Sequence, residues 1–282
     1  MLRLALMGDL HYPLIEQANR ELFELREGFY FNFLKSFLDL EADLHISLGD
    51  LTHNGLMQEF EEVYHCIRTS PVSFRHVLGN HDAYAMSKAQ ISSVMDHPPY
   101  EALETEEALL VFLDSTRELQ PQDWSGDLDA QQLEWLESQI QRNPDKPILI
   151  FAHHPVYDTT HMSRENKMHI DPLLDIPSIL GKRNGIGLYF NGHNHTHSIV
   201  HKEGWSFIQT AACLCDPSFR IVEIDSGQIQ TRVNHVEDPE ILQHAHELFK
   251  KLPGYHAPMN AHGEPSDRNC SILLPQRKAY SS

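Results

Sequence analysis

Five short clusters of Asp, His and Asn recur along the 282-residue chain, nearly all of them at the end of an apolar run. They are Asp9-Leu10-His11, Gly49-Asp50, Gly79-Asn80-His81-Asp82, His153-His154 and Gly192-His193-Asn194-His195. Their side chains offer carboxylate and amide oxygens and imidazole nitrogens, and no thiolate, and these donors suit manganese, iron or zinc. The pattern indicates two metal sites that share one carboxylate.

Apolar runs of strand character alternate with helical patterns over the first two thirds of the chain. Strands are predicted at residues 2–7, 44–48, 72–78, 109–113, 148–152 and 186–190, and helices at 19–40, 56–69, 87–95, 129–142 and 172–181. Such alternation predicts right-handed βαβ units and a largely parallel sheet. Ligands bind at the carboxyl ends of strands in such a sheet, so we expect the five clusters to share one rim.

The two-residue spacing within the clusters constrains the backbone there. On a regular strand an Asp-x-His or His-x-His pair would point to opposite faces, so both side chains reach one metal only if the strand has already become a loop. We expect the glycines at positions 8, 49, 79 and 192 to permit that abrupt turn.

The pattern changes after residue 200. Strand-like runs at 204–212, 219–224 and 229–236 follow one another with turn signals between them, which predicts an antiparallel meander in a second sheet. We therefore assign one domain to residues 1–238, with the first sheet and its metal motifs ending near residue 200 and the meander at 204–236. Residues 239–282 are predicted to form a helix at 240–252 and a surface-wrapping or mobile tail.

Composition limits the partners and the compartment. The 40 acidic residues exceed the 22 Lys and Arg and give a net charge of −18, so nucleic acid is an unlikely partner. Four cysteines without CxxC pairs favour a reducing cytoplasmic setting. The apolar run at residues 1–7 is too short for a signal peptide or a membrane span, so no membrane association is expected. Exposed sheet edges leave a homodimer possible.

From residue 1 to about 200 the ordered series of clusters resembles the calcineurin-like metallophosphoesterase superfamily. The resemblance implies an α/β fold, a four-layer α/β/β/α sandwich of two mixed sheets with the metal site at the carboxyl ends of the strands. It also implies two divalent or mixed-valence ions of Mn, Fe or Zn. Asp9, His11 and His195 would hold one ion, Asn80, His153 and His193 the other, and Asp50 would bridge them.

The same resemblance implies hydrolysis by in-line attack of a metal-bound hydroxide on phosphorus. His81 would be the catalytic histidine, facing the leaving group and stabilising or protonating the departing alkoxide. His154, beside the ligand His153, would be a supporting or a substrate-facing residue. His197 follows the last cluster closely enough to be a substrate-binding candidate as well.

Two departures from the family pattern narrow the substrate. Phosphoprotein phosphatases of the superfamily carry arginines that grip a phosphomonoester dianion, and Asn54 and Leu78 occupy the corresponding positions here. Less fixed positive charge should favour the phosphodiester monoanion, and the pattern is closest to the bacterial cyclic-nucleotide and glycerophosphodiester phosphodiesterase branch. His53 stands where many relatives have an Asp that orients the catalytic histidine, and it is a further substrate-binding candidate.

These observations favour a dinuclear phosphodiesterase that acts on a small cyclic-nucleotide or glycerophosphodiester substrate. A phosphomonoesterase or nucleotide pyrophosphatase with the same site is the alternative. A nuclease is less favoured because the acidic chain lacks a basic path for DNA. An inactive binding protein is less favoured because none of the expected metal ligands is missing.

Overall fold

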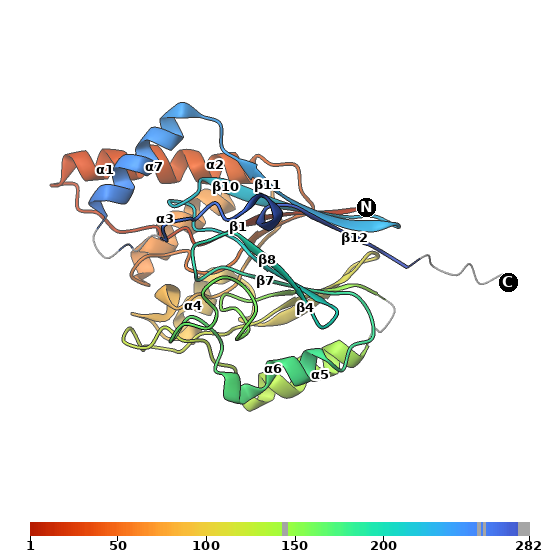
Figure 1. The fold of residues 1–282 in the computed structure, drawn as a ribbon. Helices are drawn as coiled ribbons and strands as arrows, with labels where there is room; N and C mark the ends of the chain where they lie inside the picture. The colour runs from red at the N-terminus through yellow and green to blue at the C-terminus, as the bar shows by residue number, and fades with distance from the viewer. Residues whose placement is uncertain (143–145, 253–254, 256–257, 276–282) are drawn as a thin grey trace.

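The two sheets lie at the centre of the molecule with helices on both outer sides (Figure 1). The computed structural model describes residues 1–142, 146–252, 255 and 258–275. The first sheet has the strand order β12-β11-β10-β1-β2-β3 and the second the order β4-β5-β6-β7-β9-β8. Both contain parallel and antiparallel pairs. The four-layer α/β/β/α sandwich of two mixed sheets is therefore confirmed.

The strands of the first sheet are β1 (Leu2–Met7), β2 (Leu44–Ser47), β3 (Phe74–His76), β10 (Ser218–Ile224), β11 (Gln228–His235) and β12 (Cys270–Leu273). Those of the second are β4 (Glu101–Glu104), β5 (Leu109–Phe112), β6 (Ile148–Phe151), β7 (Gly187–Asn191), β8 (Ser198–Lys202) and β9 (Trp205–Gln209). Parallel pairing runs through β1, β2 and β3 in one sheet and through β5, β6, β7 and β9 in the other.

The predicted division between the sheets is wrong. The strands that carry metal motifs belong to both sheets, and the meander does not form a sheet of its own. Its first strand, β9, lies parallel to β7, whereas β10 and β11 extend the first sheet from β1. The apolar pattern of a buried strand indicates that both of its faces are covered, but it does not indicate which strand pairs with it.

The C-terminal tail also differs from its prediction. Residues Cys270–Leu273 pair with β11 as the edge strand β12, so this part of the tail completes the first sheet. Strands β4 and β8 were not predicted either, since both are short and only partly buried on the sheet edges. The last part of the predicted tail, residues 276–282, lies outside the described residues.

The α-helices are α1 (Arg20–Arg26), α2 (Asn32–Leu38), α3 (Met57–Arg68), α4 (Lys88–Met95), α5 (Ala130–Arg142), α6 (Ile176–Leu180) and α7 (Pro239–Lys251). A π-helical turn, η1 (Glu27–Phe31), joins α1 to α2, so the helix predicted at 19–40 is continuous but bulged. Short 3₁₀ turns are η2 (His81–Ala83), η3 (Pro172–Leu174) and η4 (Pro265–Asp267). No helix among the described residues is long and apolar enough to cross a membrane.

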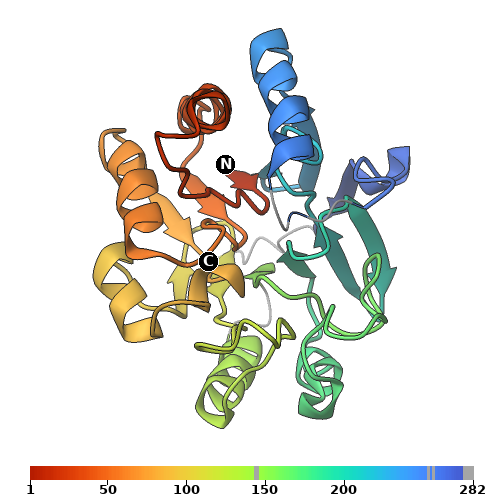
Figure 2. The same cartoon turned by 90° about the vertical axis from the view of Figure 1, so that its left-hand side faces the viewer.

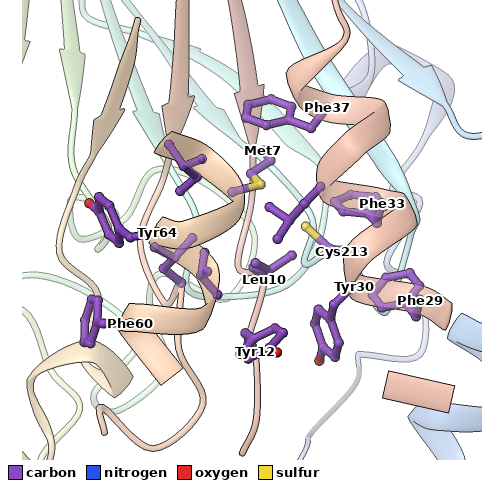
Figure 3. Packing of buried hydrophobic residues seen from close by; sticks show 14 of the residues in the cluster. Met7, Leu10, Tyr12, Phe29, Tyr30, Phe33, Phe37, Phe60, Tyr64 and Cys213 are labelled. Atoms are coloured by element: carbon purple, nitrogen blue, oxygen red, sulfur yellow. The ribbon is translucent and has the colours of Figure 1, made fainter. Parts of the chain in front are cut away.

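Three apolar clusters hold the layers together. The first lies between the helices and the outer face of the first sheet, and it includes Phe33 and Phe37 of α2 (Figure 3). The rings of these two residues pack against Phe219 of β10. The second fills the space between the sheets, and the third joins α5 and α6 to the second sheet. Because both sheets are covered on both faces, their positions are fixed by apolar burial.

This packing determines where the loops lie. Strand β1 runs from right to left in Figure 1, and Figure 2 views the molecule from that left-hand side, at which β1 ends. The loops after β1, β2 and β3 of one sheet and after β6 and β7 of the other carry the five sequence clusters. The shared rim is therefore built by both sheets together.

Candidate metal centre

The seven predicted metal ligands come together at this rim, and we call them the donor cluster. Its members are Asp9, His11, Asp50, Asn80, His153, His193 and His195. All seven are largely buried, and His195 is the most exposed of them. The donor atoms fall into two groups that meet at Asp50.

The first group joins the loops after β1 and β7. His11 Nε2 lies 3.0 Å from His195 Nε2, and His195 Nε2 lies 3.2 Å from Asp9 Oδ2. The carboxylate of Asp50 approaches from the loop after β2, with its Oδ2 3.7 Å from His11 Nε2. Four donors from three loops thus face one point.

The second group joins the loops after β3, β6 and β7. His153 Nε2 lies 3.1 Å from Asn80 Oδ1 and 3.2 Å from His193 Nδ1. The same Oδ2 of Asp50 lies 3.4 Å from His153 Nε2. One carboxylate oxygen is therefore adjacent to both groups.

Backbone carbonyls fix the tautomers in the second group. His153 Nδ1 lies 2.9 Å from the carbonyl of Leu48, and His193 Nε2 lies 3.1 Å from the carbonyl of Lys167. A carbonyl only accepts, so each of these nitrogens carries the hydrogen and donates it. Asn80 is oriented in a similar way, because its Nδ2 donates to Tyr84 Oη at 2.6 Å.

A cation fits this arrangement. If both rings are neutral, with their single hydrogens donated to those carbonyls, His153 Nε2, His193 Nδ1 and Asn80 Oδ1 present lone pairs to one another at about hydrogen-bond distance. Such a convergence of acceptors is repulsive unless a positive charge occupies the space. The donor set of imidazole nitrogen and carboxylate or amide oxygen matches what manganese, iron and zinc accept.

The pKa values of the histidines in the donor cluster also indicate that positive charge is favoured beside Asp50. Burial lowers the pKa of His193 to about 3 and that of His11 well below its usual value, so both stay neutral as a metal ligand must. Burial also acts to lower the pKa of His153, but the Asp50 carboxylate outweighs it and raises that pKa to about 9. A proton on His153 therefore takes the place of a cation beside Asp50.

The loops reach this geometry through left-handed backbone and close glycine contacts. His11, Asp50, His193 and His195 all have positive φ, between 48° and 69°. That conformation takes the chain out of the strand and lets side chains two residues apart converge, as predicted. Among the four motif glycines only Gly49 has positive φ, at 104°.

The other motif glycines are needed because they have no side chain, and not because of their backbone conformation, which corrects the prediction. A Cβ at Gly192 would lie 2.1 Å from Asp9 Oδ1, and one at Gly79 would lie 2.1 Å from the main-chain nitrogen of Asp50. Gly8 is similarly close to the carbonyl of Ala211. The loops must approach each other this closely for their ligands to meet, and only glycine permits it.

His81 lies beside the donor cluster. Its main-chain nitrogen donates to Asp50 Oδ1 at 2.8 Å, and its Nδ1 donates to the carbonyl of His53 at 2.6 Å. This leaves Nε2 as the ring nitrogen available to a substrate. The ring of His81 packs edge-on against that of His11 at a centroid distance of 4.5 Å.

The three substrate-binding candidates have different surroundings. His53 lies at the rim, where one of its ring nitrogens comes within 4.8 Å of one ring nitrogen of His11 and one of His81. His154 is fully buried, with Nδ1 2.8 Å from Ser115 Oγ and Nε2 3.0 Å from the carbonyl of Trp124. With both ring nitrogens engaged by the protein, His154 fits the supporting alternative and not substrate contact.

The prediction that His197 faces the substrate is wrong. Its ring is buried, with Nε2 3.0 Å from Asp216 Oδ2 and Nδ1 3.2 Å from the guanidinium of Arg220. Burial lowers the pKa of His197 to about 4, which keeps the ring neutral. The backbone enters β8 at Ser198, and this change of direction takes His197 away from the rim.

Two residues near the centre were missed. Asp82 is fully buried and accepts from the main-chain nitrogens of Gly79, Leu51 and Thr52 at 2.9–3.2 Å, which ties the loop after β3 to the loop after β2. Its place in the Gly-Asn-His-Asp cluster was the available signal. The ring of Tyr255 stacks on His195 at a centroid distance of 5.4 Å, and nothing in the sequence around it indicated this.

Comparison with known proteins identifies the family. A model of the calcineurin-like phosphoesterase family matches residues 2–197, well over half of the chain. The chain belongs to this family. The matched range contains every member of the donor cluster together with His81.

Two curated relatives of this family member are named for phosphodiester hydrolysis. A probable glycerophosphodiester phosphodiesterase (GpdQ) of Arcobacter nitrofigilis is 28% identical over 160 residues, which cover 55% of this chain and 57% of the relative. A 3′,5′-cyclic-nucleotide phosphodiesterase (alr5338) of Nostoc is 26% identical over 155 residues, covering 54% of this chain and 56% of the relative. The chain thus spans little more than half the length of either relative.

Solved structures agree on the fold. A dimetal phosphatase from Danio rerio superimposes with a TM-score of 0.67 at 16% sequence identity, and the match covers 83% of this chain and 96% of that one. This likeness extends beyond residue 197, since it covers more of the chain than the family model does. The fold of this dimetal phosphatase is therefore shared.

Proposed function

We propose that this phosphoesterase family member is a dinuclear metal-dependent hydrolase of small phosphodiesters. The observation that carries the proposal is the position of Asp50, whose Oδ2 lies 3.7 Å from His11 Nε2 and 3.4 Å from His153 Nε2. One carboxylate between two groups of buried donors is the arrangement that a pair of cations requires. Asp9, His11 and His195 would hold one ion, and Asn80, His153 and His193 the other.

When bound, two such ions supply Lewis acidity toward the phosphoryl oxygens and activate water at neutral pH. The protein supplies the positions. Backbone carbonyls hold His153 and His193, and the Tyr84 hydroxyl holds the Asn80 amide, so little reorganisation is needed when ions and substrate bind. Buried ligands also exclude bulk water and strengthen each electrostatic contact.

His81, as an imidazolium with hydrogens on both ring nitrogens, would deliver its Nε2 proton to the leaving group and become neutral. Its Nδ1 hydrogen is committed to the carbonyl of His53, so the ring presents Nε2 to the substrate in a fixed orientation. The orienting group is the main chain of residue 53 and not its side chain. An imidazole at position 53 in place of the family's Asp is therefore compatible with an oriented His81.

The preference for a diester follows from two sequence positions, 54 and 78, that lack the arginine side chain of the phosphoprotein phosphatases. Leu78 is fully buried, and the Asn54 side chain donates to Glu59 Oε1 at 2.9 Å. Neither position offers the bidentate arginine contacts that bind a phosphomonoester dianion. A monoanionic diester needs less fixed positive charge, and the names of the two curated relatives agree with this preference.

The test compares two chromogenic substrates on one protein. Metal-stripped protein receives Mn²⁺, and hydrolysis of bis-p-nitrophenyl phosphate is measured beside that of p-nitrophenyl phosphate. We expect turnover that requires metal and a higher kcat/KM for the diester. A higher kcat/KM for the monoester would support a phosphomonoesterase. If neither substrate is hydrolysed with or without Mn²⁺, the result would support a binding protein. A panel of cyclic nucleotides, glycerophosphodiesters and dinucleotides then identifies the substrate class.

The setting of this activity is part of the proposal. The four cysteines, Cys66, Cys213, Cys215 and Cys270, are all free thiols, which suits a reducing cytoplasmic compartment. Mn, Fe and Zn all suit the donor set. Association of two copies through an exposed sheet edge stays a prediction.

A further inference from the structure

A second group of candidate metal-binding side chains lies on residues that the family model does not match. The carboxylate of Asp216, in the loop before β10, is 1% exposed. His262 Nδ1 lies 3.0 Å from Asp216 Oδ1, and His235 Nε2 lies 3.3 Å from Asp216 Oδ2. We call these three residues the Asp216 cluster. One ligand atom from each lies within 4.8 Å of the other two.

The Asp216 carboxylate lies against the ring of His197. Among the described residues, Nδ1 of His197 faces two donors, the main-chain nitrogen of Ala211 at 3.3 Å and the guanidinium of Arg220 at 3.2 Å. This nitrogen therefore accepts, and the ring hydrogen is on Nε2, which lies 3.2 Å from Ser218 Oγ and 3.0 Å from Asp216 Oδ2. Asp216 Oδ2 is buried and has no hydrogen-bond partner among the described residues, so this oxygen is available to a cation.

His262 is held in place by its two neighbours. The carbonyl of Ala261 accepts from the main-chain nitrogen of His197 at 2.9 Å. Gly263 has a positive φ of 58°, and a Cβ there would lie 2.3 Å from the carbonyl of His197. The chain on both sides of His262 is thus packed against His197, whose ring lies beside Asp216. His235, the last residue of β11, is opposite Ser218 in the strand pair.

We propose that the Asp216 cluster binds a single zinc ion through Asp216, His235 and His262. Zn²⁺ accepts imidazole nitrogen and carboxylate oxygen at about 2.0–2.2 Å, so ligand atoms around a tetrahedral ion lie roughly 3.3 Å apart. The 3.0 and 3.3 Å distances, each to a different oxygen of Asp216, are close to that spacing, and one ligand atom from each residue lies within 4.8 Å of the other two. The side chains of His235 and His262 are 39% and 62% exposed, so the fourth position is open to water.

The bound ion would fasten the C-terminal segment to the first sheet. His262 belongs to the segment at 258–275, whereas Asp216 and His235 flank the β10–β11 pair. In the absence of an ion, Arg220 is a link between the same parts, since its guanidinium donates to the carbonyls of Asp267 and Arg268 at 3.2 Å. The zinc ion would add a further link at the exposed side, beyond those made by Arg220 and by the pairing of β12 with β11.

The experiment counts ions. Protein is dialysed to equilibrium against Zn²⁺ and the bound metal is measured by mass spectrometry for wild type, His235→Ala and His262→Ala, with His65→Ala as a control on the exposed face of α3. We expect three ions per chain in wild type and His65→Ala, and two in both cluster variants. Equal counts in all four proteins would overturn the proposal, as would a parallel loss in His65→Ala, which would indicate non-specific binding to an acidic chain.

A second measurement distinguishes zinc binding by the Asp216 cluster from a simple ion-pair cluster and from misfolding of the variant. Hydrogen exchange of residues 258–275 is followed in wild type and His262→Ala as Zn²⁺ is added. We expect exchange in this segment to slow about tenfold or more in wild type and to be unchanged by Zn²⁺ in His262→Ala, while exchange in α3 is the same in both. Slowing to the same degree in both proteins would contradict the proposal.

Discussion

The donor cluster and the Asp216 cluster use the same side-chain chemistry in opposite surroundings. In the donor cluster every histidine is largely buried, and backbone carbonyls hold His153 and His193. In the Asp216 cluster only the carboxylate is buried, and its two histidines lie at the surface. The first arrangement suits catalysis, which requires preorganised ligands. The second suits an ion that joins two parts of the chain, which requires only ligands from both parts.

The largest expected effect separates catalysis from metal binding. His81→Ala removes the proton donor beside the donor cluster and leaves all its ligands, so we expect turnover of a diester with a poor leaving group to fall by about 10²–10⁴-fold. Metal content should not change, because His81 contacts Asp50 through its main-chain nitrogen. Kinetics and metal analysis on the same preparation check this.

His65→Ala is the matched control for that variant, since His65 is an exposed histidine on α3. The contrast with the Asp216 cluster is direct. His262→Ala should lose an ion and keep turnover, whereas His81→Ala should keep all ions and lose turnover. Loss of metal together with turnover in His81→Ala would refute the assignment of His81 as proton donor.

The next effect concerns the rigidity of the donor cluster. Asp82→Asn replaces a buried carboxylate that accepts from Gly79, Leu51 and Thr52, and the new amide would place hydrogens against those donors. Hydrogen bonds to charged groups are worth about 1.5–3 kcal/mol, so we expect the free energy of unfolding to fall by about 3 kcal/mol. Urea unfolding of the metal-free protein measures it.

Asp225→Asn is the control, because Asp225 accepts from Gly227 and Gln228 through a single oxygen in an exposed turn. An Asn retains that oxygen, so the change in unfolding free energy should stay within about 0.5 kcal/mol. Equal effects of the two substitutions would mean that Asp82 does not brace the loops after β2 and β3.

The smallest expected effect is that of His53→Ala. Alanine keeps the main-chain carbonyl that accepts from His81 Nδ1, so His81 stays oriented and kcat should fall by less than about tenfold, against the 10²–10⁴-fold expected for loss of the acid itself. If the His53 ring contacts the substrate, its removal would raise KM instead. A kcat as low as that of His81→Ala would show that the side chain, and not the main chain, orients His81.

The sequence predicted the donor cluster well because its signals are local. Each ligand follows an apolar strand at once, and parallel strands bring such positions together whichever sheet they occupy. The allocation of strands to the sheets was not predictable in this way. Strand β9 reads as a buried run, and its place beside β7 depends on contacts that its own pattern does not contain.

The Asp216 cluster illustrates what local signals omit. Its members are 19 and 27 residues apart, each is an isolated Asp or His, and they meet only because β11 pairs with β10 and the C-terminal segment packs on His197. The error over His197 has the same origin. Proximity to the last metal motif suggested the substrate side, but the turn into β8 directs its ring toward Asp216.

The central claim is that two ions share Asp50, and a metal titration tests it most directly. Metal-stripped His262→Ala protein, at a concentration well above its dissociation constants, receives Mn²⁺ stepwise while hydrolysis of bis-p-nitrophenyl phosphate is measured. The same titration is made with Asp50→Asn added, and with Asp96→Asn added as a control. Asp50 and Asp96 both have positive φ, 48° and 61°, so Asn is accommodated equally at each.

We predict that activity rises mainly with the second equivalent of Mn²⁺ in the parent and in the Asp96→Asn protein. With Asp50→Asn it should stay about 10³-fold lower at every addition, because the Lewis acidity of a paired centre contributes several kcal/mol. Full activity at one equivalent, or full activity without the Asp50 carboxylate, would contradict a shared dinuclear centre.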